Sequence, residues 1–118
     1  MWSREGVYMK KKSSKLSKLE RSRYSVFYEL GVCMYCGSTY HPTIHEIFAG
    51  RNRQNSMRYG FTLPLCLECH RKLQDNKEFQ DHWKQKAQSY FEEHIGTHDD
   101  FMNIFRRNYK QDVVKMSY

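Results

Sequence analysis

The sequence predicts a small α+β domain, because two segments with strand-like patterns precede two segments with the periodicity of α-helices. A chain of 118 residues is near the commonest size for one domain, and its 39% hydrophobic content suits one modest core. Three regions are expected: a flexible basic arm over residues 1–23, a domain over 24–110 with a helical part at about 76–108, and a tail over 111–118.

Two short strands are expected on either side of a polar loop. Residues 40–50 alternate loosely between apolar and polar side chains, with Pro42 near the start, and residues 61–65 form an apolar run. The polar and basic residues 51–58 are interpreted as the loop between the two arms of a hairpin. Aromatic and β-branched residues indicate a further short strand over 24–30.

The C-terminal third carries the periodicity of two amphipathic helices. Apolar side chains recur at spacings of three and four from Phe79 to Ile95, and Gly96 provides a natural stop. Thr97 and Asp100 then have the spacing of a capping box, ahead of a second, shorter apolar stripe. Such stripes are typical of core positions, so no chemistry is assigned to them.

The four cysteines form two Cys-x-x-Cys pairs, Cys33 with Cys36 and Cys66 with Cys69. Tetrahedral zinc takes four ligands, and two such turns can supply them. A structural Zn²⁺ site is therefore predicted, with free thiols or two redox pairs as the alternatives. Four thiolates would leave no open position for substrate, so this zinc is not expected to be catalytic. His70 follows the second pair, and a helix of about three turns is expected to open there.

The charge of the chain favours a polyanionic partner. Twenty Lys and Arg against thirteen Asp and Glu give a formal charge of +7, and nucleic acid is the expected partner, DNA before RNA. The arm is expected to be mobile and either to reach for phosphates or to act as a solubilising tail. Its basic residues are Lys10, Lys11, Lys12, Lys15, Lys18, Arg21 and Arg23.

No membrane partner is expected, because no apolar run approaches the roughly 20 residues that span a bilayer. The N-terminal Met-Trp-Ser-Arg-Glu is charged almost at once and lacks a secretory apolar region. A cytoplasmic location is predicted. That compartment is reducing and suits zinc-bound thiolates.

The order of these features resembles the HNH (ββα-metal) nuclease superfamily. The chain has a Cys-x-x-Cys pair, then His45-Glu46, a basic loop, and a second pair followed by His70. Several stretches are similar to HNH-like proteins of bacteriophages and prophages: His45–Gly50, Arg53, Ser56, Tyr59-Gly60, Leu65-Cys66, Asn76–Glu78 and Phe101–Tyr109. The resemblance covers about residues 24–110 and implies a small zinc-stapled ββα-metal core followed by two C-terminal helices.

The resemblance also implies a catalytic divalent ion, Mg²⁺ or Mn²⁺, that His45 and His70 hold between a hairpin and a helix. Phosphodiester hydrolysis needs a cation to offset charge on the scissile phosphate and a base to activate water. The implied function is a metal-dependent DNA endonuclease or nickase, with a role in recombination or genome processing.

Three positions depart from the family pattern. Glu46 stands where a histidine usually acts as general base, so it is expected to orient water or to bind the metal. The asparagine in the middle of the motif is missing, and Asn52 or Asn55 is the candidate to replace it. The third metal ligand aligns with Gln74, with Asn76 as a second candidate.

Basic residues flank the proposed site and are expected either to clamp DNA phosphates or to form a solvated face. They are Arg51, Arg53, Arg58, Arg71 and Lys72. The departures leave a second function open, a nuclease-derived module that has lost catalysis and binds DNA or a host or phage protein, such as a phage inhibitor of host defence. A transcription regulator is less favoured, because no helix carries an obvious recognition face.

Overall fold

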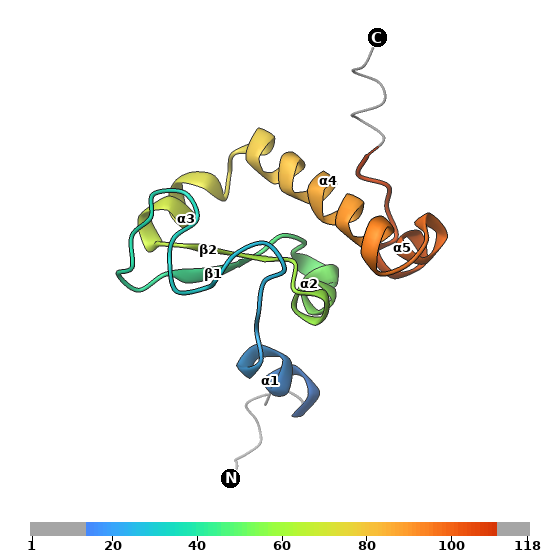
Figure 1. The fold of residues 1–118 in the computed structure, drawn as a ribbon, viewed down its shortest axis with the longest axis horizontal. Coiled ribbons are helices and arrows are strands. Elements are labelled where there is room, and N and C mark those ends of the chain that lie inside the picture. The colour runs from blue at the N-terminus through green and yellow to red at the C-terminus, as the bar shows by residue number, and fades with distance from the viewer. Residues whose placement is uncertain (1–13, 111–118) are drawn as a thin grey trace.

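The computed structural model describes residues 14–110, in which helices lie around a two-stranded sheet (Figure 1). The elements follow the chain in the order α1 (Ser14–Arg21), β1 (Thr43–Glu46), the 3₁₀ helix η1 (Gly50–Asn52), α2 (Arg53–Tyr59), β2 (Thr62–Leu65), α3 (Leu67–Leu73), α4 (Lys77–His94) and α5 (His98–Phe105). The predicted α+β class is confirmed, and β1, β2 and α3 follow one another as a hairpin and a helix.

The hairpin is antiparallel, and its two strands fall within the segments predicted from the sequence. Thr43 pairs with Leu65 and Glu46 with Thr62, so that His45 lies opposite Leu63. Side chains alternate between the faces of a strand. His45 and Leu63 therefore share one face of the sheet, and Glu46 and Thr62 share the other.

The connection between the strands is helical, and the prediction of a loop over residues 51–58 was wrong. It forms η1 and α2, and Gly60 ends α2 in the left-handed conformation at φ 74°. The Ser56 hydroxyl accepts a hydrogen bond from the Phe48 N–H and donates one to the Phe48 carbonyl, both at 2.8 Å. Polar residues favoured a loop, yet Ser56 and Met57 are buried against the core.

The segment over residues 24–30 is irregular, and the prediction of a strand there was wrong. The Ser25 hydroxyl accepts hydrogen bonds from the N–H groups of Phe27 and Tyr28, which turns the chain. The Val26 N–H donates to the Gly60 carbonyl at 2.9 Å. The aromatic and β-branched residues that suggested a strand serve the core instead, because Val26 and Phe27 pack against it.

The helices after the hairpin begin at well-defined caps. α3 begins at Leu67, inside the second cysteine pair, so His70 lies in the middle of a helix of 7 residues rather than opening a longer one. The Asn76 side chain accepts a hydrogen bond from the Phe79 N–H at 2.9 Å and caps α4. Thr97 and Asp100 form the capping box predicted for α5.

The main hydrophobic core lies between α4, α5 and the hairpin. Its buried members are Ile47, Phe48, Phe61, Leu63, Trp83, Ala87, Phe91, Phe101 and Phe105. The ring centroids of Phe48 and Phe105 lie 4.7 Å apart. The apolar stripes of α4 and α5 are core, as predicted, and they fix both helices relative to β1.

Residues 14–21 of the predicted arm form helix α1, which differs from the expectation of a mobile arm for these residues. Leu16 and Leu19 are half-buried, and α1 packs against α2. An ion pair of 2.9 Å joins Glu20 to Arg53. The composition of the arm did not predict this helix, because its few apolar residues looked too few to pack. An ion pair to α2 adds to the packing of those residues. Lys10, Lys11 and Lys12 lie outside the described residues.

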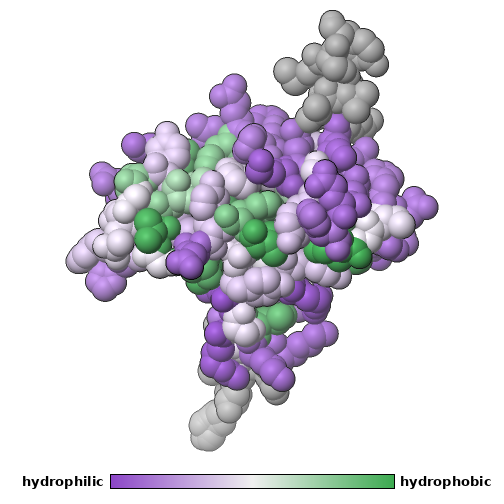
Figure 2. Space-filling model, in the orientation of Figure 1, coloured by the Kyte–Doolittle hydropathy of each residue, from purple (hydrophilic) through white to green (hydrophobic). Residues whose placement is uncertain are grey.

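The face shown in Figure 2 is largely hydrophilic, and its apolar residues lie in small separate groups. Within residues 14–110 no helix combines the length and the apolar character that crossing a bilayer requires.

Candidate functional site

The four cysteines come together in one cluster that can hold a metal ion, as predicted. Their Sγ atoms all lie within 4.8 Å of one another, and those of Cys36 and Cys66 are 3.7 Å apart. Zn–S bonds of about 2.3 Å in a tetrahedron place sulfur atoms about 3.8 Å apart. The cluster therefore fits a four-thiolate structural metal site.

The backbone around the first pair supports a thiolate. Gly37 takes a φ of 82°, and its N–H donates to the Cys33 carbonyl at 2.9 Å. Although burial raises the pKa of Cys33, backbone N–H groups of Cys36, Cys66 and Tyr35 lower it, whereas burial and the neighbouring thiols raise the pKa of Cys69. A sulfur that is charged near neutral pH is a ready zinc ligand.

His45 from β1 and His70 from α3 form a second candidate site. Nδ1 of His45 lies 3.4 Å from Nε2 of His70, and the two rings are nearly perpendicular at 86°. A tetrahedral ion with bonds of about 2.0–2.1 Å places two imidazole nitrogens about 3.3 Å apart. The two nitrogens are therefore spaced to share one ion.

The Thr43 side chain sets the orientation of His70. Its hydroxyl lies 2.7 Å from the Leu65 carbonyl oxygen, which can only accept, and 2.7 Å from Nδ1 of His70. Because the single hydroxyl proton goes to Leu65, Thr43 accepts a hydrogen bond from Nδ1–H of His70. The Nε2 lone pair of His70 is then left facing His45. Sequence reasoning missed Thr43, although a residue two before His45 in a strand shares its face.

His45 is neutral at physiological pH. Burial lowers its pKa to about 4, the neighbouring His70 and Lys84 act in the same direction, and the Gln80 side chain opposes them. A neutral imidazole is the form that binds metals. His45 also lies near Phe79 of α4, with ring centroids 6.3 Å apart.

Two amides adjoin the histidine pair, one predicted and one not. Gln74 ends α3 one helical turn beyond His70, so the two lie on the same face of that helix. Gln80 of α4 interacts with His45, and its Nε2 donates to the Leu73 carbonyl at 3.0 Å, which leaves its Oε1 as an acceptor. Both glutamines line a cavity of about 310 Å³. No sequence signal pointed to Gln80.

Asn76 is not placed to complete the site, because its side chain caps α4. Among residues 14–110 no third His, Cys, Asp or Glu groups with His45 and His70 as a metal cluster. Gln74, one turn beyond His70, and Gln80, which interacts with His45, are thus the candidates for a third ligand.

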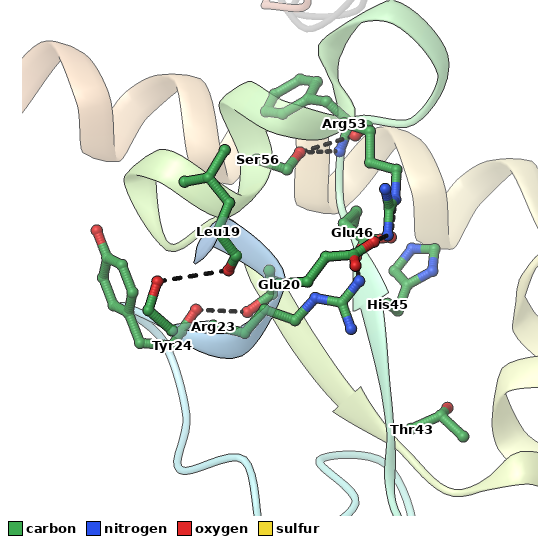
Figure 3. Close-up of polar contacts among 12 residues, drawn as sticks. Leu19, Glu20, Arg23, Tyr24, Thr43, His45, Glu46, Arg53 and Ser56 are labelled. Carbon is green, nitrogen blue, oxygen red and sulfur yellow. Dashed lines mark hydrogen bonds and ion pairs between the residues drawn. The ribbon is translucent and has the colours of Figure 1, made fainter. Parts of the chain in front are cut away.

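Glu46 lies on the face of β1 opposite to His45, beside Arg23 and Arg53 (Figure 3), which corrects its assignment as water-orienting or metal-binding residue. One carboxylate oxygen lies 2.9 Å from Nη2 of Arg23, and the other lies 3.6 Å from Nε of Arg53. Its cross-strand neighbour Thr62 donates to the Tyr24 carbonyl at 2.7 Å, on the N-terminal segment. Glu46 therefore belongs to an ion-pair network that joins β1, α1 and α2.

The basic residues predicted to clamp phosphates do not form one group. Arg53 is engaged by Glu20 and Glu46, and Arg58 donates to Oδ1 of Asn55 at 2.9 Å. The others are exposed at separate places, Arg51 in η1, and Lys72 and Arg71 on α3. Arg71 lines a second cavity, of about 550 Å³, beside Cys36 and Cys66.

Asn52 and Asn55 connect α2 to α5 rather than support a catalytic base. The Asn52 amide donates to the Phe105 carbonyl at 3.0 Å, and the Asn55 amide donates to the Ile104 carbonyl at 3.3 Å. These bonds satisfy the last carbonyls of α5. Both asparagines are structural in this arrangement.

Comparison with known proteins finds no matching family model, no matching curated protein and no matching solved structure.

Proposed function

We propose that this protein is a metal-dependent DNA endonuclease or nickase of the HNH type. The observation that carries the proposal is the distance of 3.4 Å between Nδ1 of His45 and Nε2 of His70, across a strand and the following helix. The order of hairpin, helix and histidines is the one that the resemblance implies. The formal charge of +7 supports nucleic acid as the substrate.

The donor set favours a transition metal over Mg²⁺. Imidazole nitrogens suit Zn²⁺, Ni²⁺ and Cu²⁺, whereas Mg²⁺ prefers a shell of oxygen atoms. His45 and His70 would supply two ligands, and the side-chain oxygen of Gln74 or Gln80 a third. An ion there would polarise the scissile phosphodiester and acidify water for attack on phosphorus.

The chain's own residues organise this site. Thr43 holds His70 in the tautomer whose lone pair faces His45. Burial keeps His45 neutral. In the reaction, water adds to phosphorus, one P–O ester bond breaks, and the departing oxygen takes up a proton. With Glu46 held by two arginines, no side-chain base is assigned for the attacking water.

Plasmid cleavage tests the proposal. Wild type loaded with one equivalent of Zn²⁺, enough for the four-cysteine site alone, should nick supercoiled DNA when Mn²⁺ or Ni²⁺ is added and should not nick it without a second metal. His70→Ala should lose the activity, while His82→Ala, which changes an exposed histidine of α4, should retain it. Cleavage that survives in His70→Ala contradicts the assignment of the site.

The surroundings of His45 and His70 favour a second function, that of a binding module without catalytic activity. Glu46 is held by Arg23 and Arg53, and Asn76 caps a helix, so two expected contributors to chemistry are engaged elsewhere. Such a module would shift DNA, or bind a host or phage protein, without cutting. DNA binding with no cleavage under any metal would favour this alternative.

A further inference from the structure

The cavity of about 310 Å³ beside the histidine pair is lined by basic residues that the sequence did not single out. It lies between the end of α3, the first half of α4 and the segment after α5. Gln74 and Gln80 form the wall nearest to His45 and His70, and Lys84 follows Gln80 by one helical turn. The cavity therefore lies beside the candidate metal site.

Two cations that line this cavity lie near the same aromatic ring. Nζ of Lys84 lies 5.8 Å from the centroid of the Tyr109 ring, and the Arg107 guanidinium carbon lies 5.2 Å from it. The ring is itself held in place, because its centroid lies 5.0 Å from that of Phe48 and the Tyr109 N–H donates to Oε1 of Gln88 at 2.7 Å. Both cations therefore lie near a ring that the core holds in place.

The charges around the cavity leave these two cations available. Within residues 14–110, neither Lys84 nor Arg107 forms an ion pair with a carboxylate. Of the two aspartates that line the cavity, Asp81 is paired with Lys77 at 2.5 Å and Asp75 is exposed. Among the described residues Asp75 forms no ion pair with Lys84 or Arg107, so a bound anion would offset the charge of these two cations.

We propose that Lys84 and Arg107 bind a DNA phosphate next to the scissile phosphate, which His45 and His70 would bind through their metal ion. This inference rests on the proposed function and names how its substrate is held. Arginine can contact phosphate oxygens through two N–H groups, and lysine provides a compact point charge. Gln74 lines the same cavity and lies one helical turn beyond His70, with its N–H donating to the His70 carbonyl at 3.0 Å, which places the phosphate site next to the metal site.

The test is the salt dependence of binding to a short fluorescent DNA duplex, measured by anisotropy with zinc-loaded protein and no second metal. Each lost phosphate contact reduces the slope of log K against log salt by about 0.9. Lys84→Gln and Arg107→Gln should each show that reduction. Lys84→Arg should keep the wild-type slope, because the charge remains.

Matched controls are Lys86→Gln on the same helix and Arg106→Gln beside Arg107, since both residues are exposed and neither lines the cavity. A melting curve for each variant separates lost binding from lost folding. Equal slopes for Lys84→Gln and Lys86→Gln would overturn the phosphate site and leave the nuclease proposal standing. A reduced slope in a protein that never nicks plasmid would uphold the phosphate site and overturn the nuclease. Wild type that does not bind the duplex would overturn both.

Discussion

The Thr43 hydroxyl bridges the Leu65 carbonyl and the His70 ring, at 2.7 Å from each. One strand residue thereby connects the pairing of the hairpin to the orientation of a candidate metal ligand on α3. A group that hydrogen-bonds to a metal ligand and fixes its orientation affects metal affinity, although it does not contact the ion.

Thr43→Val should therefore weaken binding of Ni²⁺ to the zinc-loaded protein by about 10-fold to 100-fold, because His70 loses the partner that fixes its tautomer. Isothermal titration measures the affinity. Thr43→Ser keeps the hydroxyl and should bind like wild type. Equal affinities for the valine and serine variants would show that Thr43 does not position His70.

Cys66→Ser, or removal of zinc by a strong chelator, should unfold the domain, because binding energy of a structural metal is folding energy. Circular dichroism follows the loss of helix signal, and zinc added back after chelation should restore it. A chelated protein that keeps both its helix signal and its melting temperature would contradict a structural role for the cluster.

Glu46→Gln should lower the free energy of unfolding by about 2 kcal/mol, because Arg23 and Arg53 would lose a partly buried charged partner. Chemical denaturation measures this change, and Glu78→Gln on the exposed side of α4 is the control. Binding of Ni²⁺ should not change in either variant. If Glu46→Gln lost cleavage without losing stability, Glu46 would have a catalytic role rather than a structural one.

Stability should fall in acid through Glu92. Although burial raises its pKa, hydrogen bonds from Gln88, His98 and Lys110 lower it to about 2. In the unfolded chain this carboxyl has an ordinary pKa of 4.5, so between pH 4.5 and 2 the unfolded state binds the extra proton. The contribution of Glu92, about 1–2 kcal/mol after allowance for solvent screening, is present above pH 4.5 and is lost over that window.

The difference in unfolding free energy between wild type and Glu92→Gln isolates this contribution, since zinc loss in acid is common to both proteins. The difference should shrink as the pH is lowered from 6 to 3. A difference that stays constant over this range would show that the Glu92 carboxyl has the same pKa in both states.

Local patterns in the sequence predicted the parts of the fold that depend on local chemistry. The apolar stripe from Phe79 to Ile95 gave α4, the Thr97 and Asp100 spacing gave the cap of α5, and the two cysteine pairs gave the metal cluster. The strand pattern around His45 was also sufficient to place β1.

What the sequence could not predict depends on tertiary contacts. Arg53 looked free for DNA, but α1 brings Glu20 to it across 33 residues. Glu46 could be assigned to a face only once the register of the hairpin was known. Lys84 and Arg107 are 23 residues apart in the chain, and only the return of the segment after α5 to α4 places both over Tyr109.

The most direct test of the account is the number and position of bound divalent ions, measured by elemental analysis and by anomalous diffraction from crystals grown with Ni²⁺. The account predicts one ion at the four cysteines and a second between His45 and His70, with the second ion missing in His70→Ala and the first retained. A wild-type crystal with no ion at the histidines, or a second ion that persists in His70→Ala, would contradict it.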